Sequence, residues 1–293
     1  MNWDDVRIFL AVARAGQILQ AARSLGVNHA TVARRITALE ESLHAKLLDR
    51  RTTGCVLTPE GEDFQLAAER MEAEMDAARA SIGETNIDVS GVVRIGAPDG
   101  FGVAYLAPRL APLLDRYPHL TIQLVPVPRT FSINRREADI VITVDRPSVG
   151  RLVARKLVDY SLGLYASRDY VARHGIPVSR EALASHRLVG FVEDLIYSPS
   201  LNYAGEMMKG QSAQFECASA LGQTEAVRAG LGIGILHGFM AREDDNLVEI
   251  LPQHAIQRAY WAVYHESTRR LARIQAVSDY IYRLVEEERA IFR

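Results

Sequence analysis

The sequence has few cysteines and no long apolar run. Of its 293 residues only Cys55 and Cys217 are cysteines, and they lie far apart without forming a CxxC pair. Neither a disulfide framework nor a zinc site is therefore predicted, and both cysteines are interpreted as inert packing residues. No run of about 18 apolar residues occurs, which excludes a transmembrane helix on length alone.

An excess of one charge and an export signal are also missing. The formal net charge is −2, so any attraction to nucleic acid must come from a local basic patch. The first residues, MNWDDVRIFLAV, carry acidic side chains where a secretory signal is positively charged, and Arg14 and Gly16 soon interrupt the apolar stretch. We therefore expect a cytoplasmic protein that has no membrane partner.

The residue patterns of common enzymes are absent as well. We find no nucleophile elbow, no paired-carboxylate site, no metal-ligand spacing and no phosphate-binding loop in a usable context. Gly230, Gly232 and Gly234 follow a predicted helix and enter a predicted strand, which is the reverse of the order that a phosphate-binding loop requires. The sequence predicts no enzyme, no cofactor and no metal.

What the sequence does contain begins with a helical pattern near the N-terminus. Its apolar content of 48% and charged content of 24% are typical of a globular chain, and its length predicts two or three domains. Apolar residues at helical spacing predict a helix over residues 4–15, and Gly16 suits its end. A second helix over residues 18–25 ends at Gly26, which permits a tight turn into a third helix.

The third helix has two chemically different faces. Asn28 is a suitable N-cap, and Val32, Ile36 and Leu39 form an apolar face. The opposite face combines small residues with groups that form hydrogen bonds, as a helix in the DNA major groove requires. The residues predicted to contact DNA are Asn28, His29, Ala30, Thr31, Ala33, Arg34 and Thr37. The alternative is a solvated face in an unrelated helical bundle.

Two short strands joined by a basic turn follow directly, over residues 47–58. Such a hairpin after a helix-turn-helix is interpreted as a wing. Arg50, Arg51 and Thr52 are predicted to meet the DNA backbone, where positive charge increases affinity without reading sequence.

A long helix is predicted from Pro59 to about Gly83, with Thr58 as its N-cap. Its apolar residues advance by alternating steps of four and three, which is the seam of a coiled coil. The predicted dimerisation residues are Phe64, Ala68, Met71, Met75, Ala78 and Ile82. The alternative is an amphipathic helix that packs on its own domain.

The second half alternates strands and helices, which indicates an α/β fold with parallel pairing. Strands are predicted at 92–97, 120–126 and 139–144, with a helix over 102–117 between the first two. A similar unit begins near Leu162. A strand over 260–265 and a helix from Thr268 would be surplus in a simple tandem of two units.

Four stretches of the sequence resemble the LysR-type family of transcriptional regulators. AARSLGVNHATVARRITALEESL followed by LLDRRTTGCVLTPEGE is similar to its DNA-binding motif, with departures at Gln17 and Leu19, where relatives often have Ser or Thr that helps to cap the helix. APDGFGVAYLAPRLAPLLDRYPHLTIQL and AVRAGLGIGIL are similar to its effector domain.

The resemblance implies the fold and the domain order. It implies an all-α winged helix-turn-helix at 1–58, a linker and dimerisation helix at 59–88, and an α/β, two-lobed, periplasmic-binding-protein-like effector domain at 89–293. Lobe I would contain 89–160 and 266–293, and lobe II would contain 161–265, with crossover strands near 157–163 and 262–267. The implied function is bacterial transcription regulation at a specific DNA operator, modulated by a small-molecule effector. The implied partners are a second copy of the chain in a homodimer or homotetramer, and RNA polymerase.

The effector is expected between the lobes, because ligands of open α/β sheets bind at the carboxyl ends of strands. The candidate contacts are Asp99, Gly100, Phe101, Arg129, Thr130, Arg146, Phe191, Gln223 and Thr224. Many relatives hold a ligand carboxylate with Ser or Thr at the start of the first helix, where this chain has Gly100 beside Asp99. The Asp99 carboxylate would cap that helix or repel an anion, whereas Arg129 and Arg146 favour an anion.

Two other kinds of regulator stay open. One is switched by oxidation of Cys217, and the other is an architectural DNA-binding protein without a ligand.

Overall fold

The computed structural model describes residues 2–51, 54–81, 89–126, 138–147, 152–196, 198–208, 210–268 and 271–293. The chain forms two compact units. The first contains Met1–Val92, Tyr117–Thr121 and Glu266–Ala276, and the second contains Val93–Arg116, Ile122–His265 and Val277–Arg293. Thr52, Ile82, Arg129 and Thr130 lie outside the described residues.

The first unit contains the predicted helix-turn-helix. Helices α1 (Trp3–Ala15), α2 (Ile18–Leu25) and α3 (His29–Leu43) enclose an apolar core. Asn2 caps α1 in a capping box with Asp5, and Gly16 ends that helix at a φ of 67°. The N-cap of α2, Gln17, forms no side-chain capping bond, as its departure from the family pattern predicts.

The wing is tied to the helices around it. Strands β1 (Leu48–Arg51) and β2 (Gly54–Leu57) pair antiparallel. The amides of Leu47 and Leu48 donate to Glu40 Oε1 of α3 at 2.9 and 3.1 Å. Burial raises the pKa of Glu40, but hydrogen bonds from Lys46 and these amides outweigh it, so the pKa lies below its ordinary value. The Glu40 carboxylate therefore holds the wing at the end of α3.

Helix α4 (Pro59–Ser81) begins as predicted, with the Gly61 amide donating to Thr58 Oγ1 at 3.0 Å. A Cβ at Gly61 would lie 2.0 Å from the Leu47 carbonyl oxygen, so the helix starts too close to the wing for any other residue. Phe64 packs edge-on against Phe9 with the ring centroids 5.2 Å apart. The first half of α4 is thus part of the core of its own unit.

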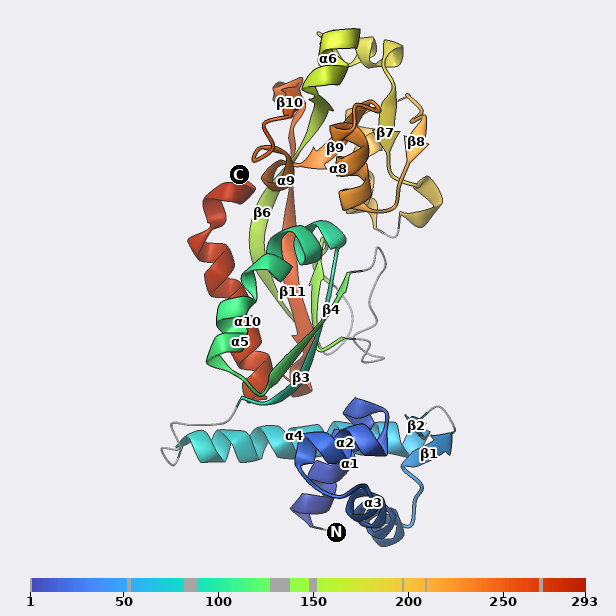
Figure 1. The fold of residues 1–293 in the computed structure, drawn as a ribbon, viewed down its shortest axis with the longest axis vertical. Coiled ribbons are helices and arrows are strands. Elements are labelled where there is room, and N and C mark those ends of the chain that lie inside the picture. Colours follow the sequence, from blue (N-terminus) through green and yellow to red (C-terminus); the bar gives the residue numbers. More distant parts are fainter. Residues whose placement is uncertain are drawn as a thin grey trace. The chain divides into compact units, whose positions relative to one another are not determined.

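A curled sheet runs through the rest of the chain (Figure 1). Its order is β4-β3-β5-β11-β6-β9-β7-β8, and β10 also pairs with β6. The strands are β3 (Gly91–Ala97), β4 (Leu120–Pro126), β5 (Ile140–Thr143), β6 (Leu152–Ser167), β7 (Leu188–Gly190), β8 (Phe215–Glu216), β9 (Ile233–His237), β10 (Leu247–Ile250) and β11 (Ile256–His265).

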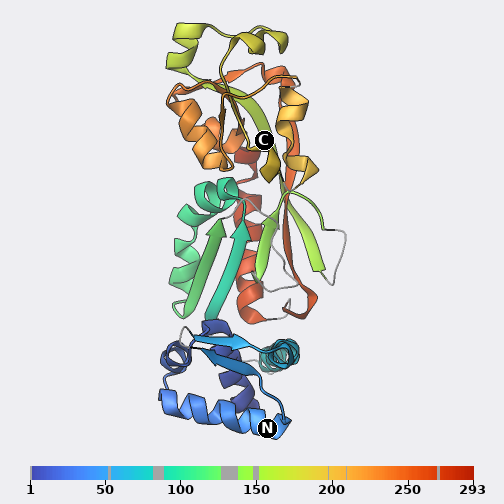
Figure 2. The same ribbon diagram turned by 90° about the vertical axis from the view of Figure 1, so that its right-hand side faces the viewer.

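Two long antiparallel strands, β6 and β11, join two smaller groups of strands (Figure 2). Strands β3 and β5 pair in parallel on one side, and β7 pairs in parallel with β8 and β9 on the other. We call the part with β3, β4 and β5 lobe I, and the part with β7, β8, β9 and β10 lobe II. The strand that looked surplus in the sequence, β11, is therefore one of the two crossovers.

The helices of this α/β part differ in one place from the prediction. In place of one helix over 102–117 the chain forms a π-helix η1 (Gly100–Leu106), a 3-10 turn η2 (Ala107–Arg109) and α5 (Ala111–Arg116). Pro108 and Pro112 lack the amide donors that a continuous helix needs, which explains the breaks. The other helices are α6 (Arg168–His174), α7 (Tyr203–Met207), α8 (Ala220–Arg228), α9 (Gly238–Ala241) and α10 (Ala272–Glu287).

Candidate functional site

The two faces of α3 differ in exposure as the sequence predicts. Val32, Ile36 and Leu39 are fully buried. On the opposite side His29, Ala30 and Arg34 are exposed, and the remaining predicted contacts of α3 that lie within the helix, Thr31, Ala33 and Thr37, are half-buried. Small and polar groups thus form the accessible face of a rigid helix, which is the surface that a major-groove contact requires.

Neighbouring residues of α3 have structural partners. The Asn28 side chain accepts from the Ala30 amide at 2.9 Å and so caps the helix, as expected for an N-cap. Arg35 donates to Asp5 of α1 at 3.0 Å and lies 3.5 Å from Asp4. Arg35 therefore fixes α3 against α1, whereas Arg34 beside it is exposed.

The wing contributes basic side chains near the same helix. Arg50 and Arg51 are both exposed on β1. The Arg50 guanidinium donates to Thr37 Oγ1 at 3.4 Å, which brings a wing residue and an α3 residue together. The structure thus joins a candidate base-reading helix to candidate phosphate contacts on one surface.

The predicted seam of α4 divides into two parts. Phe64 and Ala68 contact the core of their own unit, and Ala68 is fully buried. Met71 and Met75 are 39% and 42% exposed, and Ala78 is exposed as well. The exposed part of the seam that could meet a second copy is therefore its later half.

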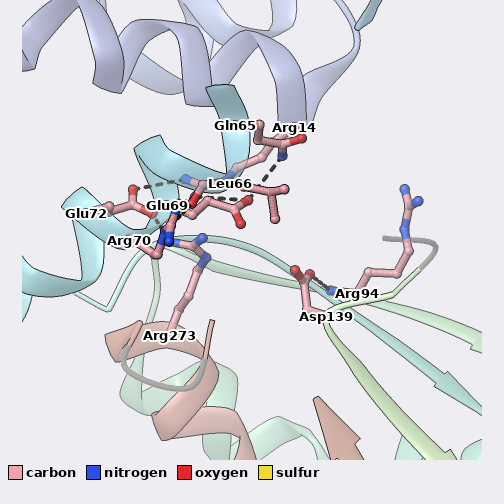
Figure 3. A network of polar contacts seen from close by, with 9 residues as sticks. All are labelled: Arg14, Gln65, Leu66, Glu69, Arg70, Glu72, Arg94, Asp139 and Arg273. Atoms are coloured by element: carbon pink, nitrogen blue, oxygen red, sulfur yellow. Dashed lines mark hydrogen bonds and ion pairs between the residues drawn. The ribbon is translucent and has the colours of Figure 1, made fainter. Parts of the chain in front are cut away.

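A carboxylate that the sequence did not single out connects three elements of the first unit (Figure 3). Arg14 of α1 donates to Glu72 of α4 through two bonds of 3.0 and 2.5 Å. Arg273, in the first turn of α10, donates to the same carboxylate at 3.1 Å. Sequence periodicity gives no signal for this cluster, because its members are side chains on the polar faces of three separate helices.

Among the candidate effector contacts, Asp99 has the clearest partners. It lies just after β3, and its side chain does not cap η1, so the capping role considered for it in the sequence is wrong. Its Oδ2 instead accepts from Ser219 Oγ at 2.5 Å and from the Leu221 amide at 3.3 Å, at the start of α8 in lobe II. Gly100 is buried, and a Cβ there would lie 3.4 Å from that of Ala220.

Three other candidates have structural roles. Phe101 is fully buried, with its ring centroid 4.9 Å from that of Tyr260. The side-chain Nε2 of Gln223 donates to the Cys217 carbonyl at 2.7 Å, and the Thr224 hydroxyl donates to the Ala220 carbonyl at 2.9 Å. Substituting Phe101 would therefore act first on the core.

Two further candidates are more accessible. Arg146 is exposed after β5, with its guanidinium 5.7 Å from the centre of the Trp261 ring. Phe191 is half-buried after β7.

A second aspartate at the same strand ends was not among the candidates. Asp145 follows β5, and its Oδ1 accepts from Ser200 Oγ at 2.5 Å, while its other oxygen accepts from Ser198 Oγ. Its position after a predicted strand was visible in the sequence, but its partners lie 53 and 55 residues away in lobe II.

His237 lies close to the first of these aspartates. Burial lowers the pKa of His237 to about 4 despite the nearby negative charge of Asp99. The imidazole is therefore neutral at pH 7, and it stacks on Tyr160 with centroids 5.3 Å apart.

Both cysteines, Cys55 and Cys217, are free thiols and half-buried. Within the described ranges, no group of three or more His, Cys, Asp or Glu side chains is arranged to hold a metal ion. A search of the same residues finds no helix long and apolar enough to cross a membrane. A redox role for Cys217 stays a prediction.

Comparisons with known proteins agree along the whole chain. Residues 3–62 match the family model of the bacterial regulatory helix-turn-helix protein, lysR family, and residues 87–285 match that of the LysR substrate binding domain. The chain is 30% identical to the HTH-type transcriptional regulator CrgA of Neisseria meningitidis, over 98% of this chain and 97% of that protein.

Solved structures give the same result. The structure of CrgA from Neisseria meningitidis superposes on this chain with a TM-score of 0.61 and 28% sequence identity. The alignment covers 98% of this chain and 99% of the CrgA chain. A full-length OxyR variant from Pseudomonas aeruginosa has a TM-score of 0.66, covers 96% of this chain and 94% of its own, and is 17% identical, so it supports the fold alone.

Proposed function

This chain belongs to the LysR family of DNA-binding transcriptional regulators, whose operator binding an effector modulates, and we propose how its residues divide that work. The domain boundaries follow the functions: 1–58 reads DNA, 59–88 dimerises and 89–293 senses the effector. Lobe I comprises 89–160 and 266–293, and lobe II comprises 161–265. The regulator acts in the cytoplasm and performs no chemistry on its effector.

DNA reading belongs to α3 and the wing. Arg34 contacts a base edge or a phosphate in the major groove, with His29, Ala30 and Thr37 beside it. Arg50 and Arg51 of β1 contact the phosphate backbone, and Thr52, which lies outside the described residues, is proposed as a further contact. The observation that carries this assignment is the exposed face of α3 beside Arg50, whose guanidinium contacts Thr37.

The effector binds where the residues after the strands of lobe I meet lobe II. Asp99 supports this position, because its carboxylate contacts the start of α8 in lobe II. The proposed contacts are the predicted residues at these strand ends, including Arg129 and Thr130 beyond the described ranges. A small molecule that binds one lobe arrangement more tightly than another shifts operator affinity by that difference.

The functional assembly is a homodimer through the later half of α4, doubled to a homotetramer through the effector domains. Met71 and Met75 support this, because they are large apolar side chains exposed on a helix. RNA polymerase is the partner through which a bound regulator changes transcription.

Arg34→Ala tests the DNA assignment. An operator is first selected from random duplexes with the wild-type chain. At fixed salt, Arg34→Ala should weaken operator binding by about 1–3 kcal/mol and leave the oligomeric state unchanged, because it removes one groove contact. Arg7→Ala, which removes an exposed arginine paired with Asp4 on α1, is the control for net charge. Equal operator affinity of the Arg34 and Arg7 variants would show that α3 does not read the operator.

A further inference from the structure

Two aspartates of lobe I occupy equivalent positions after neighbouring strands. Asp99 follows β3 and Asp145 follows β5, and these strands pair in parallel with Ile95 opposite Ile140. The carboxyl ends of parallel neighbours lie at the same edge of a sheet. Both carboxylates are therefore presented at the edge of lobe I where the chain crosses to lobe II.

Asp99 completes the start of a helix in the other lobe. Ser219 is the N-cap of α8, and its Oγ accepts from the Gly222 amide at 3.1 Å. The same hydroxyl donates to Asp99 Oδ2, which also accepts from the Leu221 amide. A carboxylate here satisfies an otherwise unpaired helix amide and interacts favourably with the helix dipole.

Asp145 makes the corresponding contact at a second point. Ser198, only 7% exposed, is the N-cap of the short turn η6 (Pro199–Leu201), and its hydroxyl donates to Asp145. Ser200 donates to the other carboxylate oxygen. Among the residues that the structure describes, neither Asp99 nor Asp145 forms an ion pair, so neutral donors of lobe II satisfy both charges.

We propose that these contacts form a double latch, Asp99 with Ser219 and Leu221 and Asp145 with Ser198 and Ser200, which sets the resting orientation of the two lobes. All acceptors are on lobe I and all donors on lobe II, so the lobes cannot separate without breaking both groups of bonds. The regulatory meaning of the latch rests on the proposed function. An anionic effector that uses the amides of α8 must displace the Asp99 carboxylate.

Hydrogen exchange on the full-length chain, without effector or DNA, measures how strongly each carboxylate protects the segment of lobe II that it contacts. Asp99→Ala should accelerate exchange over residues 219–224 by on the order of tenfold, because the Leu221 amide loses its acceptor and the lobes part more often. Asp145→Ala should do the same over residues 198–202. The control is Asp169→Ala, which removes an exposed carboxylate from α6 of lobe II. Asp99→Asn keeps the shape of the side chain and one acceptor oxygen, so residues 219–224 should exchange at an intermediate rate. This variant replaces Asp99→Ala in the experiment if the alanine variant folds poorly.

Acetate provides a matched rescue. In Asp99→Ala the start of α8 lacks its carboxylate, and a helix start of this kind favours anions. Sodium acetate should therefore slow exchange over residues 219–224 in Asp99→Ala, relative to sodium chloride at equal ionic strength. It should leave that segment unchanged in the wild type and in Asp145→Ala.

The outcomes separate the latch from the proposed function. Exchange in Asp99→Ala equal to that in Asp169→Ala would mean that there is no latch. A second outcome would also overturn the proposal. If the latch variants exchange faster but bind the operator, without effector, as tightly as the Asp169→Ala control does, the contacts are only local helix caps. A changed operator affinity in both latch variants supports it. Failure of the wild type to select an operator would remove the proposed function but not the exchange result.

Discussion

Glu72 is the side chain through which α1, α4 and the start of α10 are joined in the first unit. Burial raises the pKa of this carboxyl group. The hydrogen bonds and charges of Arg14 and Arg273 lower the pKa by more than burial raises it, so the net pKa is about 2. A carboxylate with a depressed pKa stabilises the folded state above its unfolded pKa, near 4.5, and this stabilisation is lost as the pH falls towards 2. This lowering of the pKa corresponds to a contribution on the order of 3 kcal/mol to the free energy of unfolding at pH 7.

Glu72→Gln should therefore destabilise the first unit by about 2–4 kcal/mol at pH 7, because two guanidinium groups lose their shared anion. The difference from the wild type should shrink as the pH falls from about 4.5 towards 2. Urea unfolding can be followed by Trp3 fluorescence in a Trp261→Phe background, since these are the two tryptophans and Trp3 packs on the first unit's core.

Glu41→Gln, at an exposed position of α3, is the matched control for Glu72→Gln. A Glu72→Gln midpoint equal to that of the control, or a difference independent of pH, would contradict the assigned role of the cluster.

Single residues differ in how far the sequence reveals them. The exposure of Arg34 and the burial of Ile36 follow from helical periodicity, which depends on near neighbours alone. The partners of Asp99 do not, because Ser219 is 120 residues away and the contact exists only after both lobes fold. Arg273 and Glu72, 201 residues apart, are beyond sequence patterns for the same reason.

At the scale of elements, α4 shows why a periodic pattern can serve two surfaces. Its predicted seam runs the length of the helix, but Phe64 and Ala68 pack on the winged domain and Met71 and Met75 do not. Periodicity identifies an apolar face and is silent about which neighbour covers it. Packing on its own domain therefore describes the first part of α4, and the dimer seam of the later part stays a prediction.

Met71→Glu combined with Met75→Glu should dissociate dimers that form through α4, because four like charges would enter a paired seam. Both side chains are exposed in the single chain, so its folding should be unaffected. Sedimentation of the full-length variant should show a smaller assembly, and cooperative binding to two operator half-sites should be lost.

The matched control, Met71→Leu with Met75→Leu, keeps the apolar seam and should retain the wild-type assembly. If the glutamate pair sediments and binds paired half-sites as the leucine pair does, α4 does not form the dimer.

In the segment after β3, the apolar pattern predicts the helical content but not the kind of helix. Its apolar pattern predicts one helix over 102–117, yet the chain forms a π-helix, a 3-10 turn and a short α-helix. The prolines that interrupt it are visible in the sequence. The π-helical turn is not, because it depends on how Phe101 and Tyr105 pack with Phe292 in the core.

For the whole molecule, the net charge of −2 gives no overall attraction to DNA. Arg34, Arg50 and Arg51 are exposed on α3 and the wing, so the positive charge proposed to meet phosphate is local. Such charge acts by releasing counterions, and it acts on every DNA sequence alike. The salt dependence of binding should therefore report the wing, while sequence preference reports α3.

Arg51→Ala should lower the affinity for the selected operator and for random duplexes by the same factor. Each bound dimer loses two phosphate contacts, so the slope of log affinity against log salt should become shallower by about 2 for each dimer on the DNA. Arg173→Ala removes the same charge from an exposed position on α6 and should leave the slope unchanged. Titrations of both duplexes over a range of salt measure all three quantities. If Arg51→Ala lowers the affinity for the operator only, Arg51 reads bases. If the salt slope of the affinity does not change, the wing does not contact the DNA.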